Sequence, residues 1–155
     1  MPKKYQKLVW YLLFAQALLA MLGSLYFSNF GDPIVNIAEG NFFGPLGFYP
    51  CRFCWWARIL MYPIVALSLV GILRKDKHFT AYVLALSIPG LLLETYHYAL
   101  QKFPALITDT CTVGSSCSTI EVEYFGFITI PFLCLIAFLV INILALVNTW
   151  MNRQK

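Results

Sequence analysis

Charged side chains in this 155-residue chain gather at the ends of four long apolar stretches, and this placement restricts the possible folds. Charged residues make up 12% and hydrophobic residues 60%, against roughly 25% and 45–50% in soluble domains. This balance excludes an ordinary soluble domain, a disordered chain and a coiled coil. Because each helix needs ~20 residues to cross the hydrocarbon of a bilayer, the length allows one domain of four spans with short connections.

The apolar stretches predict membrane-spanning helices at about residues 8–27, 51–73, 79–100 and 124–150. The first stretch follows three lysines and exceeds the ~7–15 apolar residues of a signal peptide, so we expect an uncleaved helix. The expected fold class is therefore an all-α membrane protein with a four-transmembrane-helix bundle. Residues 1–155 are expected to form a single integral membrane domain.

The basic residues predict the orientation of the bundle. Eight of the eleven lysines and arginines would share one side of the membrane: Lys3, Lys4, Lys7, Arg74, Lys75, Lys77, Arg153 and Lys155. The positive-inside rule places both termini on the cytoplasmic side, together with the basic loop. Two extracytoplasmic loops follow, at about residues 28–50 and 102–123. The basic residues form no binding face for nucleic acid, so membrane lipid is the expected environment.

The cysteines form two pairs and one single residue. Cys51 and Cys54 make a C-x-x-C, while Cys111 and Cys117 enclose a short loop, and both pairs fall on the side where disulfides are permitted. The pairs can form inert structural disulfides that staple short loops, they can bind zinc, or they can form a redox centre. Zinc fits least, because the second pair is spaced too widely, and no metal is predicted. Cys134 is expected to pack as a small buried hydrophobic residue in the fourth span.

The surroundings of the C-x-x-C favour redox chemistry. Pro50 precedes Cys51, so Cys51 to Cys54 is expected to form the first turn of the second span, where unpaired N–H groups and the helix dipole stabilise a thiolate. Arg58 follows Cys54 at i+4, on the same face and ~10 Å along the helix from Cys51. An arginine inside the membrane is costly and indicates a functional site, although it can also serve as a snorkelling anchor. An inert staple needs no such arginine.

The third span carries a second polar stripe near the same surface. Glu94, His97 and Gln101 are spaced i, i+3 and i+7, which places them on one helix face. Taken singly, they fit an interfacial polar cap and a packed histidine. Together with Arg58 at a similar depth, they predict a pocket for a molecule with a polar head and an apolar tail.

Three segments of the chain resemble the DsbB family of membrane thiol oxidases. They are the Pro-Cys-x-x-Cys-x-x-x-Arg motif at residues 50–58, the Tyr-His-Tyr-Ala-Leu-Gln run at 96–101, and the Phe-Gly-Phe-Ile-Thr-Ile-Pro run at 125–131. The resemblance covers nearly the whole chain in order. The short spacing from Cys111 to Cys117 is similar to that of the compact Gram-positive form often called BdbC.

The resemblance implies an enzyme, a quinone-dependent protein disulfide oxidoreductase. Such a protein is a multi-pass component of the bacterial cell membrane, with its active-site cysteines on the extracytoplasmic side. It reoxidises a DsbA-like thioredoxin-fold thiol oxidase and passes the electrons to a membrane quinone, either menaquinone or ubiquinone. This activity would support disulfide bond formation in exported proteins.

The resemblance also implies roles for individual residues. Cys111 is expected to receive the attack of the partner's thiolate, and Cys117 then exchanges with Cys51. Cys54 is left as the thiolate that faces the quinone. Arg58, His97 and Gln101 are the expected quinone-binding residues.

Two other functions fit parts of the pattern. A vitamin K epoxide reductase-like enzyme shares four helices, a C-x-x-C and quinone chemistry, but its loop cysteines precede the C-x-x-C, whereas here they follow it. A non-catalytic membrane protein stapled by two disulfides is the other alternative. The intramembrane position of Arg58 argues against the staple.

Overall fold

The computed structural model describes residues 3–40, 43–44, 47–103 and 120–153. These residues are helical apart from their connections, and among them no strand forms beyond one isolated bridge. Four helices are long and apolar enough to cross a membrane, as predicted. They are α1 (Lys3–Phe30), α3 (Arg52–Arg74), α4 (Phe79–Lys102) and α5 (Ile130–Arg153), and a short α2 (Pro33–Ala38) follows α1.

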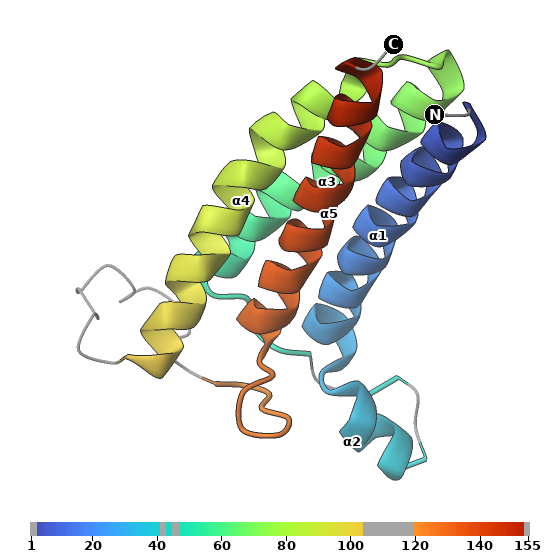
Figure 1. Cartoon of the computed structure of the whole chain (residues 1–155). Coiled ribbons are helices and arrows are strands. Elements are labelled where there is room, and N and C mark those ends of the chain that lie inside the picture. The colour runs from blue at the N-terminus through green and yellow to red at the C-terminus, as the bar shows by residue number, and fades with distance from the viewer. Residues whose placement is uncertain (1–2, 41–42, 45–46, 104–119, 154–155) are drawn as a thin grey trace.

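The four long helices pack as a bundle. Helix α1 contacts α3 and α5, and α4 contacts the same two helices from the other side (Figure 1). The start of α1, the end of α5 and the α3–α4 connection lie together, and we call this the terminal end. Helix α2, the start of α3 and residues 120–129 lie at the opposite end, which we call the cysteine end. Alternate helices therefore run in opposite directions, which brings the start of α3 beside the end of α4.

The helix boundaries differ from the predicted ones at the cysteine end. Helix α5 begins at Ile130, later than the predicted start near residue 124. Phe125 and Gly126 have φ angles of 54° and 77°, which a helix cannot accommodate, and a turn closes between Tyr124 and Ile128. Helix α1 continues to Phe30, beyond its predicted end, because no proline or glycine interrupts residues 28–30 before Gly31 at φ 79°.

Helix α2 was not predicted, although its start signal is present in the sequence. Asp32 caps it by accepting a hydrogen bond from the Ile34 backbone N–H at 2.8 Å, and Pro33 occupies the first turn. Asp32 also accepts a hydrogen bond from the Tyr124 hydroxyl. This bond joins the segment after α1 to the segment before α5 at the cysteine end.

The outward faces of the long helices are apolar, as contact with lipid requires. Large hydrophobic side chains are exposed along all four helices, among them Leu12, Leu19, Ile59, Leu69, Leu92, Ile143 and Leu146. A soluble protein would bury most of this surface. The surface supports the assignment of the chain as a multi-pass membrane protein.

Buried polar side chains join the helices in the half of the bundle nearer the terminal end. Asn142 on α5 donates to the Ser87 carbonyl at 3.1 Å and accepts from the Ser87 hydroxyl at 3.0 Å. Asn148 accepts from the Trp10 indole N–H at 2.8 Å and donates to Thr80 at 3.3 Å. Such hydrogen bonds between helices stabilise membrane bundles, where the hydrophobic effect does not hold helices together.

A close contact between α4 and α5 depends on a glycine. A Cβ at Gly90 would lie 2.3 Å from the ring of the fully buried Phe138. We expect Gly90→Ala to lower the free energy of unfolding by about 1–3 kcal/mol, because overpacking moves a buried ring off its rotamer. Unfolding in detergent, followed by circular dichroism, measures the change.

The matched control for this substitution is Gly23→Ala in α1. A Cβ at Gly23 meets nothing within 4 Å. Alanine there should leave stability unchanged or raise it by up to about 1 kcal/mol, because alanine favours helix over glycine. Equal destabilisation by the two substitutions would contradict the packing role of Gly90.

Candidate functional site

A cavity of about 420 Å³ opens between the helices at the cysteine end. Its walls are mainly apolar and come from all four long helices, with Leu19, Phe27, Ala57, Met61, Leu133 and Phe138 among them. The polar side chains that reach it are Gln16, Ser24, Cys51, Cys54, Arg58, Tyr62, Glu94, His97, Gln101, Glu121 and Cys134. Cavities of this size and composition are typical of sites for small organic ligands.

The C-x-x-C forms the start of α3, as predicted. Cys51 is the N-cap residue, with extended backbone, and its sulfur accepts a hydrogen bond from the Cys54 backbone N–H at 3.4 Å. The two sulfur atoms lie 2.9 Å apart, both as free thiols. Cys51 is buried, with 6% of its surface exposed, while Cys54 is half-buried and lines the cavity. The pair is therefore placed for exchange and for contact with a molecule in the cavity.

Cys51, which lies just before the span, holds the more stabilised thiolate of the pair. The hydrogen bond from the Cys54 side chain lowers the pKa of Cys51, against burial, which raises it. The hydrogen bond and the positive charge of His97 also lower the pKa of Cys51. The sequence predicted a stabilised thiolate in this turn, but it did not predict which sulfur of the free dithiol receives these contacts.

Arg58 lies one turn below Cys54 and lines the same cavity. Its Nε donates to the Ser24 hydroxyl at 3.0 Å, and one terminal nitrogen lies 3.4 Å from the Ser24 carbonyl. The guanidinium also lies over the Trp55 ring, 5.4 Å from its centroid. These contacts hold the guanidinium at the cavity wall, and its role in binding a ligand stays a prediction.

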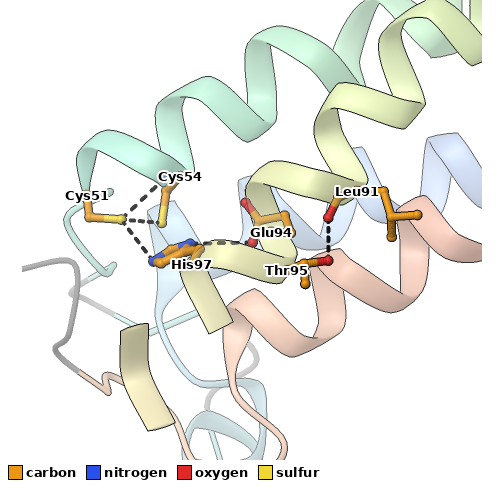
Figure 2. Close-up of polar contacts among 6 residues, drawn as sticks. All are labelled: Cys51, Cys54, Leu91, Glu94, Thr95 and His97. Carbon is orange, nitrogen blue, oxygen red and sulfur yellow. Dashed lines mark hydrogen bonds and ion pairs between the residues drawn. The ribbon is translucent and has the colours of Figure 1, made fainter. Parts of the chain in front are cut away.

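His97 connects α4 to the cysteines. Its Nε2 lies 3.6 Å from the Cys51 sulfur, and its Nδ1 lies 3.4 Å from a carboxylate oxygen of Glu94 (Figure 2). The Phe53 ring packs against the imidazole with a centroid distance of 5.2 Å. His97 and Glu94 are both buried, with side-chain exposures of 3% and 1%. The predicted polar stripe of α4 therefore faces the site, and Gln101 reaches the same cavity.

Cys134 differs from its predicted environment. It has no disulfide partner among the described residues, but its side chain is half-buried and lines the cavity instead of packing in the core. Pro131, Cys134 and Ala137 share one face of α5, and all three line the cavity. Cys134 therefore borders the space between the helices, although its neighbours Pro131 and Ala137 on this face are buried.

The second predicted cysteine pair, Cys111 and Cys117, lies outside the described residues. Within the described part of the chain, one cluster brings three metal-binding atoms within 4.8 Å of one another: the two thiols of the C-x-x-C and the His97 imidazole. Thiolate and imidazole are zinc ligands. The prediction that the chain uses no metal stays a prediction.

Some residues of the site were not predicted. Ser24 binds Arg58 and also lies 3.4 Å from the Tyr62 hydroxyl, which ties α1 to α3 at the cavity wall. Gln16 reaches the cavity from the same helix. A serine and a glutamine within an apolar span are weak signals, and only the packing of α1 against α3 reveals their contacts.

Comparison with known proteins decides the family. The family model described as "Disulfide bond formation protein DsbB" matches residues 42–148, more than half of the chain. The chain belongs to the DsbB family. The matched range contains both cysteine pairs, Arg58 and the α4 stripe, so the resemblance found in the sequence motifs is confirmed.

Several relatives of this DsbB-family chain carry related names. It is 41% identical over 128 residues to "Disulfide bond formation protein C" of Bacillus subtilis, covering 82% of each chain. It is 38% identical over 148 residues to "Probable disulfide formation protein" of Oceanobacillus iheyensis, covering 94% of this chain and 91% of the relative. A "Probable disulfide formation protein C" of Halalkalibacterium halodurans is 39% identical over 131 residues, with 84% and 85% coverage. No solved structure matches the chain.

Proposed function

We propose that this DsbB-family chain reoxidises a DsbA-like thioredoxin-fold thiol oxidase and passes the electrons to a membrane quinone. The coarser role, that of a thiol–disulfide oxidoreductase, follows from the family and from the names of the relatives. The observation that carries the finer proposal is the opening of the C-x-x-C onto a mainly apolar cavity whose polar groups include Arg58, His97 and Gln101.

The residues around the cavity fit a quinone. The apolar walls suit a hydrophobic ring, Arg58 offers hydrogen-bond donors for ring oxygens, and His97 can donate a hydrogen bond from Nε2 once that nitrogen is protonated. A quinone bound there would accept two electrons and two protons, which protein side chains cannot do alone. Arg58 would bind and orient the head group, while the half-buried Cys54 faces it.

The proposed order of exchange uses all four paired cysteines. The order starts from two disulfides, Cys111–Cys117 and Cys51–Cys54. The partner's thiolate attacks Cys111, the first of these bonds breaks, and Cys117 is released as a thiolate. Cys117 then attacks Cys51, a disulfide forms between those two residues, and Cys54 leaves as a thiolate at the cavity. The N-terminus of α3 and the Arg58 guanidinium one turn further along the helix favour negative charge on the departing Cys54 sulfur.

Purified protein in lipid nanodiscs tests the proposal. We expect it to oxidise a reduced thioredoxin-fold partner with stoichiometric loss of added menaquinone or ubiquinone, followed by its absorbance. The chain with Cys54→Ser should do neither. Oxidation of the partner without quinone consumption would contradict the electron path, and no oxidation at all would favour a stapled structural protein.

The cysteine order and the family argue against a vitamin K epoxide reductase-like enzyme. We further propose that the 155 residues form one integral domain of the bacterial cell membrane. In this proposal both termini are cytoplasmic and the cysteine end faces the extracytoplasmic side, where disulfides of exported proteins form.

Thiol labelling tests this orientation. After reduction of intact cells, a membrane-impermeant maleimide should label Cys51, Cys54, Cys111 and Cys117 but not Cys134. This expectation rests on the positive-inside rule, because eight of the eleven basic residues are expected at the terminal end and three at or toward the other. Cys51, with 6% of its surface exposed, should react more slowly than the half-buried Cys54.

The control uses the opposite end of the bundle. His78 is exposed in the α3–α4 connection, so His78→Cys in a chain without native cysteines should react only after the cells are opened. Labelling of this residue in intact cells, with protection of the native pairs, would reverse the orientation.

A further inference from the structure

Glu94 is the only buried acidic residue in the described part of the chain, with 1% of its surface exposed. Neither carboxylate oxygen accepts a hydrogen bond from a described residue, and the contact it makes is with Nδ1 of His97 at 3.4 Å. Glu94 also lines the cavity. A carboxylate inside a membrane-spanning helix is costly and indicates function.

Glu94, His97 and Cys51 form a continuous chain of contacts. The imidazole lies between the other two, with Nδ1 toward the carboxylate and Nε2 toward the thiol (Figure 2). A carboxylate beside Nδ1 holds a histidine ring in place and keeps a proton on that nitrogen, which leaves Nε2 free to accept one. A thiol, an imidazole and an orienting group in this order activate cysteine nucleophiles on unrelated folds.

We propose that Glu94 is a positioning residue that holds His97 as the proton acceptor for Cys51. In the dithiol form, the S–H bond of Cys51 breaks and an N–H bond forms at Nε2 of His97. The electron pair stays on the sulfur and becomes available for the disulfide bond, and the imidazolium is stabilised by Glu94. The inference rests on the proposed function and deepens it, because it assigns the proton that leaves the cysteine before electrons can pass on.

The same carboxylate also repels a Cys51 thiolate, and this effect opposes the proposal. Glu94 contacts His97 directly, whereas His97 lies between Glu94 and Cys51. Because attraction to the nearer imidazolium exceeds repulsion over the longer path, the net effect of Glu94 should favour the thiolate. Arg58 does not take over this role, since its described hydrogen bonds go to Ser24.

The position of the imidazole proton gives the first test. The chain has two histidines, and His78 lies at the terminal end, so ¹⁵N-histidine labelling provides its own reference signal. In the reduced protein, we expect Nδ1 of His97 to carry a proton, and Glu94→Met should remove this preference without changing His78. An unprotonated Nδ1 in the unsubstituted protein overturns the proposal, and that measurement needs no variant.

The reactivity of Cys51 gives the second test. Alkylation of the reduced full-length chain by iodoacetamide at about pH 5, followed by peptide mass spectrometry, reports the thiolate because an ordinary thiol is protonated there. We expect Glu94→Met to slow modification of Cys51 about tenfold, as for loss of one charged neighbour. Glu94→Gln should slow it less than Glu94→Met, because its amide oxygen can face Nδ1 and orient the imidazole although the charge is lost.

Two controls separate positioning from general electrostatics. Glu121 also lines the cavity without a described contact to His97, so Glu121→Met should leave the Cys51 rate unchanged. In a His97→Asn chain, Glu94→Met should cause no further loss. Three results would each overturn the proposal. They are equal slowing by Glu94→Met and Glu121→Met, additive losses in the double variant, and a normal rate in Glu94→Met. These measurements use no partner and no quinone, so they remain informative if the proposed electron path fails.

Discussion

Replacing any one of Cys51, Cys54, Cys111 and Cys117 by serine is expected to abolish oxidation of the partner. Each of the four is a covalent participant in the proposed exchange, and loss of a nucleophile commonly lowers turnover by a factor on the order of 10³ or more. Steady-state consumption of partner thiols by protein in nanodiscs measures the effect. Serine preserves size and polarity, so the fold of each variant should survive.

Cys134→Ala is the matched control for these substitutions. The sulfur lines the cavity but forms no disulfide with a described residue. We therefore expect turnover to remain within about twofold of that of the unsubstituted chain, since this small change in side-chain size alters only the shape of the cavity. Loss of electron flow in Cys134→Ala, with tolerance at the paired positions, would overturn the relay of two cysteine pairs.

Arg58→Met is expected to slow quinone reduction by about 10²-fold, the usual cost of removing a charged donor aimed at developing negative charge. The guanidinium lies at the cavity wall, held by Ser24 and by the Trp55 ring. Its charge favours a thiolate at Cys54 and the anionic forms of a quinone that is being reduced. Methionine keeps an apolar stem and is easier for the membrane to accommodate, so folding should survive. Lysine should restore only part of the rate, because it lacks the planar fork.

Two measurements on this variant locate the defect. Steady-state quinone reduction should fall, together with the apparent affinity for quinone, while a single turnover of partner oxidation should proceed normally. Arg52→Met is the matched control, because Arg52 is exposed at the start of α3, away from the cavity. Unchanged quinone kinetics in Arg58→Met would identify Arg58 as a membrane anchor and remove the main support for the quinone site.

The placement of charge was enough to predict the four spans, because hydrocarbon tolerates few ionisable groups over ~20 residues. It was less informative about the ends of the helices. The start of α5 depends on left-handed backbone at Phe125 and Gly126, and phenylalanine gives no signal of that conformation. Apolar composition at residues 124–129 resembles a span, although these residues form a turn.

The residues of the candidate site were predicted where one helix carries them at fixed spacing. Cys54 and Arg58 share a face of α3, and Glu94, His97 and Gln101 share a face of α4. Contacts between helices were not predictable in the same way. The bond from Arg58 to Ser24 depends on how α1 and α3 are rotated against each other, and a single sequence does not encode that rotation in any local pattern.

The antiparallel bundle is built unevenly along its length. Asn142 and Asn148 join α1, α4 and α5 toward the terminal end, and the cavity occupies the half nearer the cysteines. We therefore expect substitutions in the two halves to have different effects. In the joined half a changed side chain should lower the stability of the fold, whereas in the hollow half it should mainly change the volume of the cavity.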